Sequence, residues 1–283
     1  MKPAEALHAA RQSLTEAGIE EPGLEAEVLL RHVLHWERHE LYARLQEEIS
    51  PAQQAEFQAL IERRRAHEPT AYIVGHREFY GLELETTPAA LIPRPETELL
   101  VEEALRIARS TETSPLIIAD VGCGGGAIAI ALAHHLTDAA IYALDASDEA
   151  LGLADRNAER LGVRGRIRFL QGDLLDPLPE TVDIIAANLP YVKTADWETL
   201  PPEIRKHEPR TALDAGPTGT EVIERLLRTA PNHLRPHGAL LAEIGWDEGE
   251  RVREIARECF PGAHVAIRKD LASLDRILRI DAP

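Results

Sequence analysis

From residue 96 onward, short apolar runs typical of strands alternate with segments of helical spacing, and this alternation limits the possible folds. The expected strands are Leu116–Val121, Ala140–Asp145, Ile167–Gln171, Val182–Ala187, Gly238–Ile244, His264–Ile267 and Arg276–Ile280. Strands separated by helices form parallel sheets covered on both faces. Only the last two runs are joined by a short loop, so they predict an antiparallel hairpin at the sheet edge. The sequence therefore predicts an α/β fold with a mostly parallel, seven-stranded, doubly wound sheet.

The residues before this sheet show different sequence patterns. Leucines and other apolar residues recur at helical spacing in residues 1–70, where Ser50 and Pro51 resemble an N-cap followed by proline at the first helical position. Residues 71–95 contain β-branched and aromatic residues between glycine and proline breaks. We therefore expect a small helical bundle over residues 1–70, a β-hairpin linker over 71–95 and the sheet domain over 96–283.

Charge and cysteine content exclude several classes of function. The 283 residues include 48 acidic and 31 basic side chains, a net charge of −17, which argues against sequence-blind binding to nucleic acid. The two cysteines, Cys123 and Cys259, are too few for a disulfide framework or a zinc site, and we expect no metal. The first residues lack an apolar signal core and no window approaches 18 apolar residues, so a cytoplasmic protein that does not span a membrane is expected.

The stretch "IIADVGCGGGAIAIALA" predicts a strand, a glycine turn and a helix. Gly122, Gly124 and Gly126 allow a tight turn and a close approach of a ligand to the backbone, and the following helix start offers free N–H groups. Asp145 ends the next strand, where a carboxylate can accept hydrogen bonds from both hydroxyls of a ribose. Together these residues predict a cofactor that contains a nucleoside.

The identity of that cofactor stays open at this point. Gly122-x-Gly124-x-x-Ala127 also fits the dinucleotide fingerprint, so NAD is one candidate. Asp120 precedes the turn and favours a cofactor with a cationic amino-acid moiety, as in S-adenosylmethionine, although an aspartate there could simply cap the turn. After the third strand, Asp173 or its backbone could meet an adenine amino group while Leu174 packs on the ring; a turn-forming aspartate is the alternative.

Asn188 follows the fourth apolar run in "DIIAANLPYV", at the end of a strand expected beside the glycine turn. An amide or exocyclic amino nitrogen is a poor nucleophile because its lone pair is delocalised. The side-chain oxygen of Asn188 and the carbonyl of Leu189 could accept its two N–H bonds and aim it at an electrophilic methyl group. Tyr191 could pack on the planar acceptor. An ordinary strand end followed by a proline turn is the alternative.

Beyond these residues, nearly the whole chain resembles the HemK/PrmC family of release-factor glutamine N5-methyltransferases. The resemblance is carried by "GHREFYGLELETTPAALIPRPETELLVE", with Pro93–Glu98 as its most specific part, and by "DVGCGGGAIAIALA". Further along, "EIRKHEPRTALDAGPTG", "AEIGWDEGE" and "DLASLDRILR" match the family pattern in the same order.

This resemblance implies methyl transfer from S-adenosylmethionine to the glutamine of the Gly-Gly-Gln motif in class 1 peptide chain release factors. It implies a class I, Rossmann-like methyltransferase domain whose N-terminal bundle selects the protein substrate, without direct contact with nucleic acid. By position, the cofactor would be held by Asp120, Gly122, Cys123, Gly124, Gly125, Gly126, Asp145, Asp173, Leu174 and Asn188. Catalysis and glutamine binding would fall to Asn188, Leu189, Pro190 and Tyr191.

The chain departs from the family at one point of the motif, because Leu189 stands where Asn-Pro-Pro-Tyr has its first proline. The backbone carbonyl is retained, and a residue before proline stays biased to extended geometry. Asn-Leu-Pro-Tyr also resembles the motif of rRNA adenine dimethyltransferases, so adenine-N6 methylation of RNA or DNA is an alternative. Glutamine methylation of a ribosomal protein is another. A role on the substrate side for Pro93–Glu98, and a lid formed by residues 207–209, are further hypotheses.

Overall fold

The computed structural model describes residues 1–111 and 115–283, and these divide into two compact units. The first comprises residues 1–76 and 201–207, and the second comprises residues 77–200 and 208–283. The short segment 201–207 groups with the first unit although the sequence analysis assigns it to the sheet domain. Its distance along the chain from residue 76 explains why no local pattern indicates this.

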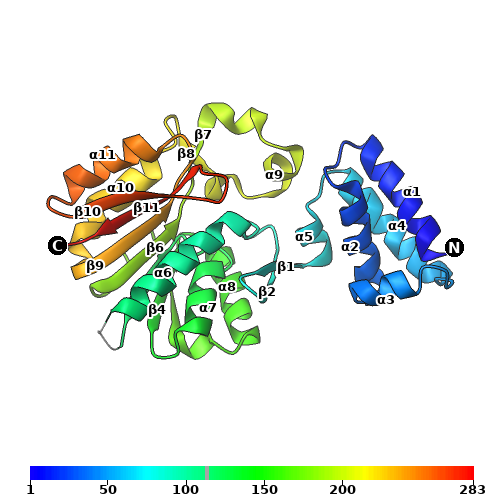
Figure 1. Cartoon of the computed structure of the whole chain (residues 1–283), viewed down its shortest axis with the longest axis horizontal. Helices are drawn as coiled ribbons and strands as arrows, with labels where there is room; N and C mark the ends of the chain where they lie inside the picture. The colour runs from blue at the N-terminus through cyan, green and yellow to red at the C-terminus, as the bar shows by residue number, and fades with distance from the viewer. Residues whose placement is uncertain (112–114) are drawn as a thin grey trace. The chain divides into compact units, whose positions relative to one another are not determined.

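The first unit is a helical bundle, as predicted (Figure 1). Its helices are α1 (Pro3–Glu16), α2 (Pro22–Leu34), α3 (Arg38–Ala43), α4 (Pro51–Arg65), α5 (Thr70–Val74) and α9 (Pro202–His207). Leu14, Leu29 and Leu41 are completely buried between them. Ser50 caps α4 by accepting a hydrogen bond from the Gln53 backbone N–H at 3.2 Å. The apolar spacing and the cap residue thus produce the expected structure.

The hairpin predicted in the linker consists of β1 (His76–Phe79) and β2 (Leu82–Glu85). Phe79 and Leu84 are buried in the core of the sheet domain. The carboxylate of Glu98 accepts a hydrogen bond from the Tyr80 backbone N–H at 2.9 Å and so ties the hairpin turn to the first helix of that domain. The linker is therefore fixed by burial and by a hydrogen bond to its turn.

The second unit is built on a seven-stranded sheet with the order β10-β11-β9-β6-β3-β4-β5. The strands are β3 (Ile117–Val121), β4 (Ala140–Asp145), β5 (Ile167–Gln171), β6 (Val182–Asn188), β9 (Leu234–Glu243), β10 (His264–Lys269) and β11 (Asp275–Asp281). All neighbouring pairs are parallel except those that involve β11. The prediction of a mostly parallel sheet with an antiparallel edge hairpin is confirmed, and the structure adds that β11 lies between β9 and β10.

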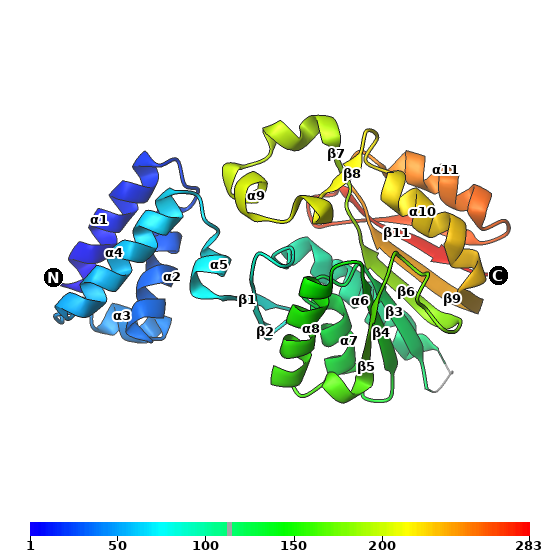
Figure 2. The same ribbon diagram turned by 180° about the vertical axis from the view of Figure 1, so that it is seen from behind.

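Helices cover both faces of this sheet (Figures 1 and 2). On one face lie α6 (Glu98–Ser110), α7 (Ala127–His135) and α8 (Asp148–Arg160), and on the other α10 (Glu221–Thr229) and α11 (Gly249–Cys259). Consecutive strand residues point to opposite faces: Ile118 packs toward the first group and Ala119 toward the second. Both faces are apolar, which is why the strands read as continuous apolar runs.

The remaining regular structure is short and lies mostly in connections. It comprises the parallel pair β7 (Val192–Lys193) and β8 (Asp214–Gly216) and the 3-10 turns η1 (Pro95–Thr97), η2 (Arg164–Arg166), η3 (Thr194–Thr199), η4 (Arg210–Ala212) and η5 (Ala230–Asn232). The β7–β8 pair was not predicted, since strands of two and three residues have no recognisable period. None of the helices in residues 1–111 and 115–283 is long and apolar enough to cross a membrane.

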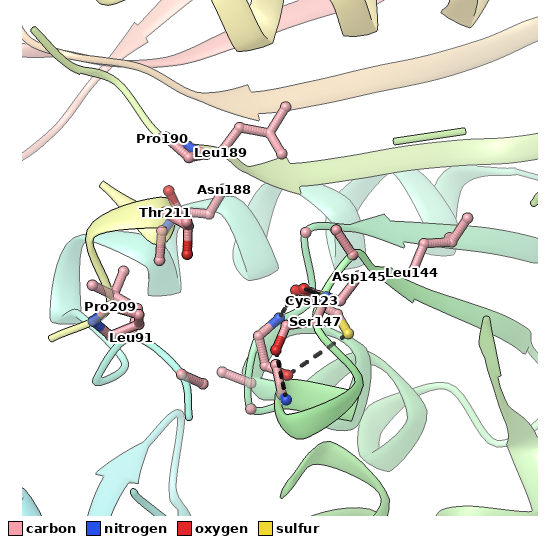
Figure 3. A pocket seen from close by; sticks show the side chains of 18 of the residues that line it. Leu91, Cys123, Leu144, Asp145, Ser147, Asn188, Leu189, Pro190, Pro209 and Thr211 are labelled. Carbon is pink, nitrogen blue, oxygen red and sulfur yellow. Dashed lines mark hydrogen bonds between the residues drawn. The ribbon is translucent and has the colours of Figure 1, made fainter. Parts of the chain in front are cut away.

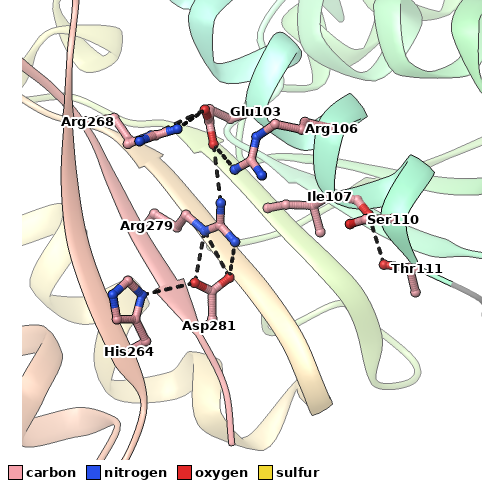
Figure 4. A network of polar contacts seen from close by, with 9 residues as sticks. All are labelled: Glu103, Arg106, Ile107, Ser110, Thr111, His264, Arg268, Arg279 and Asp281. Carbon is pink, nitrogen blue, oxygen red and sulfur yellow. Dashed lines mark hydrogen bonds and ion pairs between the residues drawn. The ribbon is translucent and has the colours of Figure 1, made fainter.

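An arginine cluster around Glu103 joins α6 to the edge hairpin (Figure 4). The Glu103 carboxylate, only 9% exposed, accepts hydrogen bonds from Arg106 at 2.5 Å, Arg268 at 3.0 Å and Arg279 at 3.5 Å. Burial on its own would raise the pKa of Glu103, but hydrogen bonds from Arg106 and Arg268 lower it overall. The ionised carboxylate therefore holds together three guanidinium groups from α6, β10 and β11.

We expect Glu103→Gln to lower the free energy of unfolding by about 1–3 kcal/mol, because the buried carboxylate loses charge-assisted hydrogen bonds. The deficit should shrink below about pH 4, since a carboxylate with a lowered folded-state pKa stabilises only while it is ionised. Glu250→Gln is the matched control. Glu250 makes the same i,i+3 pair with Arg253 on an exposed surface. Its replacement should lower the free energy of unfolding by less than about 1 kcal/mol. Equal effects of the two variants in denaturant titrations would contradict this.

Candidate active site

A cavity of about 600 Å³ opens at the carboxyl ends of the central strands (Figure 3). The central strand β3 is followed by a helix on one face of the sheet, whereas the segments after β6 lead to the other face, so no side-chain layer fills the space between them. The walls come from residues 122–125 after β3, 144–147 at the end of β4, 172–174 after β5 and 188–190 at the end of β6, together with residues 88–94 of the linker. The predicted convergence of the glycine turn, Asp145 and Asn188 is therefore observed.

The glycine turn is tight, and two of its positions leave no room for a side chain. Gly122 has φ +72°, and a Cβ there would lie 2.8 Å from the Leu189 side chain. Gly126 has φ +87°, and a Cβ there would lie 3.0 Å from Ala154 of α8. The backbone N–H groups of Gly122 and Cys123 both donate to the carbonyl of Leu144, at 2.8 and 2.9 Å. Because the glycines have no side chains, the turn can lie against β4 and present its backbone to the cavity.

Asp145 is oriented by two backbone hydrogen bonds. Its Oδ2 accepts from the Gly124 N–H at 2.8 Å, and its Oδ1 accepts from the Ser147 N–H at 2.9 Å. An ionised carboxylate oxygen can accept more than one hydrogen bond, so each retains an acceptor site. Two fixed acceptors beside a glycine cradle have the chemistry needed to bind the vicinal hydroxyls of a ribose.

Asp120 lies beneath the glycine turn and does not line the cavity. Its side chain is completely buried, Oδ2 accepts from the Ala129 N–H in the first turn of α7 at 2.8 Å, and Oδ1 has no hydrogen-bond partner in the described part of the chain. Burial raises the pKa of Asp120 to about 7, and the charge of Asp145 adds to the rise. These contacts support the turn-capping alternative, and direct cofactor contact by Asp120 stays a prediction.

Cys123 and Gly126 occupy different positions in the turn. The Cys123 thiol lines the cavity but is largely buried, and burial raises its pKa well above the usual value, so it stays protonated. Gly126 precedes α7 and is not part of the cavity wall. The part of the turn that lines the cavity is therefore residues 122–125.

Asp173 and Leu174 follow β5 and line the cavity, as predicted. The Asp173 carboxylate forms an ion pair with Arg225 of α10, and both side chains are about half exposed. Leu174 adopts φ +46°, in the left-handed region, and packs at the border of the core. The Asp173 carboxylate is thus already paired, so the backbone beside it and the Leu174 side chain are the groups free to meet a planar ring.

Asn188 ends β6 beside Glu243 of β9. Its Nδ2 donates to the hydroxyl of Thr97 at 2.9 Å, and no hydrogen bond from a described side chain reaches its Oδ1. Leu189 is 5% exposed and packs into the core under the glycine turn, while Pro190 lines the cavity. Leu189 thus contributes a buried side chain that packs against Gly122.

Tyr191 is not among the residues that line the cavity, and its hydroxyl lies near Glu243. Its hydroxyl lies 3.5 Å from Glu243 Oε1, a long hydrogen bond, and burial raises the pKa of Tyr191 to about 12. Burial also raises the pKa of Glu243, while a hydrogen bond from Thr97 and the charge of Arg276 oppose the rise. Packing of Tyr191 on the acceptor stays a prediction. Sequence reasoning missed Thr97 and Glu243, although a glutamate ending an apolar strand was a visible signal.

The outer wall of the cavity joins the linker to a distant loop. Glu208, 6% exposed, accepts a hydrogen bond from the Ile92 N–H at 3.2 Å and forms an ion pair with Arg94. Pro209 and Thr211 follow it and line the same cavity as Ala89–Arg94. This pairing holds two walls together, so the linker and the loop after α9 close one side of the site.

The chain matches known proteins over nearly its full length. Residues 5–75 match the family described as PrmC N-terminal domain, and residues 118–207 match a methyltransferase domain family. The release factor glutamine methyltransferase of Moorella thermoacetica is 44% identical over 273 residues, which cover 96% of this chain and 95% of that protein. The protein of the same name from Geobacter sulfurreducens is 41% identical over 243 residues, covering 86% and 84%.

Solved structures share the fold at lower identity. The catalytic domain of hMettl16, in complex with MAT2A 3'UTR hairpin 6, superposes with a TM-score of 0.59 and 16% identity, covering 76% of this chain and 84% of that one. At this identity the likeness concerns the fold alone.

The buried Asp120 predicts a stability that falls with pH. A carboxyl group with a raised folded-state pKa binds more protons in the folded than in the unfolded state, so stability is lost as pH rises from about 4 through 7. Asp120→Asn should remove this dependence, and the unfolding free energy of the original protein relative to the variant should fall by about 2 kcal/mol between pH 5 and 8. A constant difference would show that Asp120 is ionised throughout; the unpaired amide hydrogens of the variant only add a pH-independent offset.

Proposed function

The chain belongs to the family of release factor glutamine methyltransferases, and on this premise we propose that it methylates the glutamine of the Gly-Gly-Gln motif in class 1 peptide chain release factors. The acceptor atom is the side-chain amide nitrogen, N5, and the methyl donor is S-adenosylmethionine. One observation supports this assignment most directly: Asp145 at the end of β4 and Asn188 at the end of β6 line the same cavity.

The cavity fits the methyl donor. Asp145 presents two fixed acceptors to the ribose, Gly122–Gly125 form the cradle, and Leu174 offers an apolar surface for the adenine. When bound, S-adenosylmethionine supplies a methyl group on a positively charged sulfur. The chain's own residues then have to desolvate and orient the acceptor nitrogen rather than create a strong base.

Orientation of that nitrogen falls to Asn188 and the backbone beside it. The free Oδ1 of Asn188 and the carbonyl of Leu189 would accept the two N–H bonds of the glutamine amide. Acceptors placed there stabilise the positive charge that develops on nitrogen as the N–C bond forms, and a fixed near-attack geometry removes entropy from the barrier. The extra proton leaves after transfer, when the methylated amide is strongly acidic.

The first unit supplies the recognition of the protein substrate in this proposal. Residues 5–75 of this unit match the family described as PrmC N-terminal domain. The helices of the unit carry none of the residues that line the cavity. Residues 1–70 would therefore select the release factor, while residues 96–283 perform the transfer. The linker over residues 71–95 would contribute both the connection and one wall of the site.

The Asn-Leu-Pro-Tyr motif makes adenine a second candidate acceptor. The exocyclic amino nitrogen of adenine is planar and a poor nucleophile, like the nitrogen of a glutamine amide. We expect label from methyl-labelled S-adenosylmethionine to enter a class 1 release factor and not its variant with the motif glutamine replaced by alanine. A ribosomal protein and RNA serve as competing substrates in parallel reactions. Label in RNA or the ribosomal protein but not in the release factor would refute the proposed substrate.

Two alanine variants should separate chemistry from cofactor binding. Asn188→Ala is expected to reduce kcat at least a hundredfold, as for a lost oxyanion-hole donor, while cofactor Kd changes by less than about tenfold. Asp145→Ala should instead weaken cofactor binding by about tenfold or more, because it removes two charged hydrogen bonds. Calorimetry and single-turnover transfer measure these quantities. Full activity of the Asn188 variant would remove the role assigned to this amide.

A further inference from the structure

A buried chain of polar groups leads from Asn188 away from the cavity. Asn188 Nδ2 donates to Thr97 Oγ1 at 2.9 Å, and the Thr97 hydroxyl donates to Glu243 Oε2 at 2.7 Å. Thr97 is 4% exposed and Glu243 is 2% exposed, so water does not compete for these bonds. Three residues from η1, β6 and β9 thus form one connected unit.

The hydrogen bonds of this unit run in one direction, from Asn188 to Thr97 and from Thr97 to Glu243. Thr97 donates to Glu243 Oε2 and Tyr191 to Oε1, so the structure uses Glu243 only as an acceptor. Burial raises the pKa of Glu243, and the hydrogen bond from Thr97 and the charge of Arg276 oppose that rise. A hydroxyl has a single proton, and the Thr97 hydroxyl uses its proton in the hydrogen bond to Glu243. The Thr97 oxygen can then only accept, so the Asn188 side chain must turn its NH₂ group toward it.

An asparagine amide can flip by 180° and exchange its oxygen and nitrogen with little change in shape. In one orientation Asn188 presents Oδ1 to the cavity and can accept a hydrogen bond from the substrate. In the other it presents NH₂, which would repel the N–H bonds of a glutamine amide. Catalysis by Asn188 therefore requires that one of the two orientations be excluded.

We propose that Thr97 and Glu243 are positioning residues that hold Asn188 with its carbonyl oxygen toward the acceptor nitrogen. This inference rests on the proposed function of Asn188, and neither residue itself touches the substrate. Removing the threonine hydroxyl takes away the partner of Nδ2, and replacing the glutamate by glutamine offers Thr97 a donor, which frees its proton to bond a flipped amide.

The sequence around Thr97 explains how it is held in place. Thr97 ends η1, and its backbone N–H donates to the Arg94 carbonyl at 3.1 Å. On one side Arg94 is paired with Glu208, and on the other Glu98 binds the Tyr80 N–H. The segment Pro93–Glu98 thus has separate contacts for closing the cavity wall, orienting Asn188 and fixing the hairpin. This gives the most specific part of the linker signature a physical role on the substrate side.

The variants Thr97→Val, Thr97→Ser and Glu243→Gln test the proposal. Valine keeps the shape and removes the hydroxyl, whereas serine keeps the hydroxyl and is the matched control. We expect the valine and glutamine variants to lose about ten- to a hundredfold in kcat, with cofactor Kd within about threefold. The serine variant should retain at least half of the original kcat. The double variant should be no worse than the poorer single variant, because one connected unit is already broken.

A spectroscopic measurement reads the orientation without catalysis. The sequence contains three asparagines, Asn157, Asn188 and Asn232, so ¹⁵N-asparagine labelling gives three side-chain NH₂ pairs. The pair of Asn188, assigned by its loss in Asn188→Asp, should exchange slowly with water in the original protein. In Thr97→Val and Glu243→Gln it should shift and exchange at least tenfold faster. Asn157, buried and bonded to the Glu85 and Gly125 carbonyls, is the internal reference.

The outcomes distinguish this inference from the proposed function. If release factors are not methylated but the Asn188 pair responds as described, the orientation is supported and the substrate is wrong. If Thr97→Val keeps its kcat and the Asn188 pair is unchanged, Thr97 is an ordinary buried threonine and the inference is refuted. If Thr97→Ser fails together with Thr97→Val, packing of the methyl group rather than the hydroxyl is what matters, which also refutes it.

Discussion

The functional site depends on one constraint: β3 lies between two parallel strands, and the connections that follow these strands leave on opposite faces of the sheet. The covering layers therefore separate at the carboxyl end of β3, and a cavity remains that core side chains cannot fill. Asp145 and Asn188 reach this cavity because each ends a strand beside β3. Their convergence is a consequence of strand order, and it needs no flexible loop to bring them together.

Most of the groups around the cavity are held by the backbone or by each other before any ligand arrives. Asp145 is fixed by two N–H groups, Asn188 by Thr97, and the linker wall by Glu208. Such preorganisation matters for methyl transfer to an amide, since the acceptor is weak and the protein can contribute mainly orientation and matched dipoles. The apolar runs of the sheet supply the rigidity, and the strand ends supply the polar groups.

The residues of the site are of two kinds, those that a local pattern predicts and those that only a distant contact defines. Gly122, Asp145 and Asn188 were identifiable because each follows an apolar run and because sheet topology brings such positions together. Asp120 was also identifiable, but whether it faces a ligand or supports a turn depends on the direction of one side chain beneath α7. Thr97 and Glu243 were missed because they lie 146 residues apart in the chain and acquire a shared role only through contact.

By itself, the sequence determined the alternation of strands and helices, the glycine turn with its acid, and the amide at the end of β6, because period, backbone freedom and strand ends are local properties. Only the tertiary structure decided that β11 inserts between β9 and β10, that residues 201–207 group with the first unit, and which side of Asn188 faces the cavity. Those features arise from pairings between distant segments, whose energies depend on contacts that no local pattern encodes.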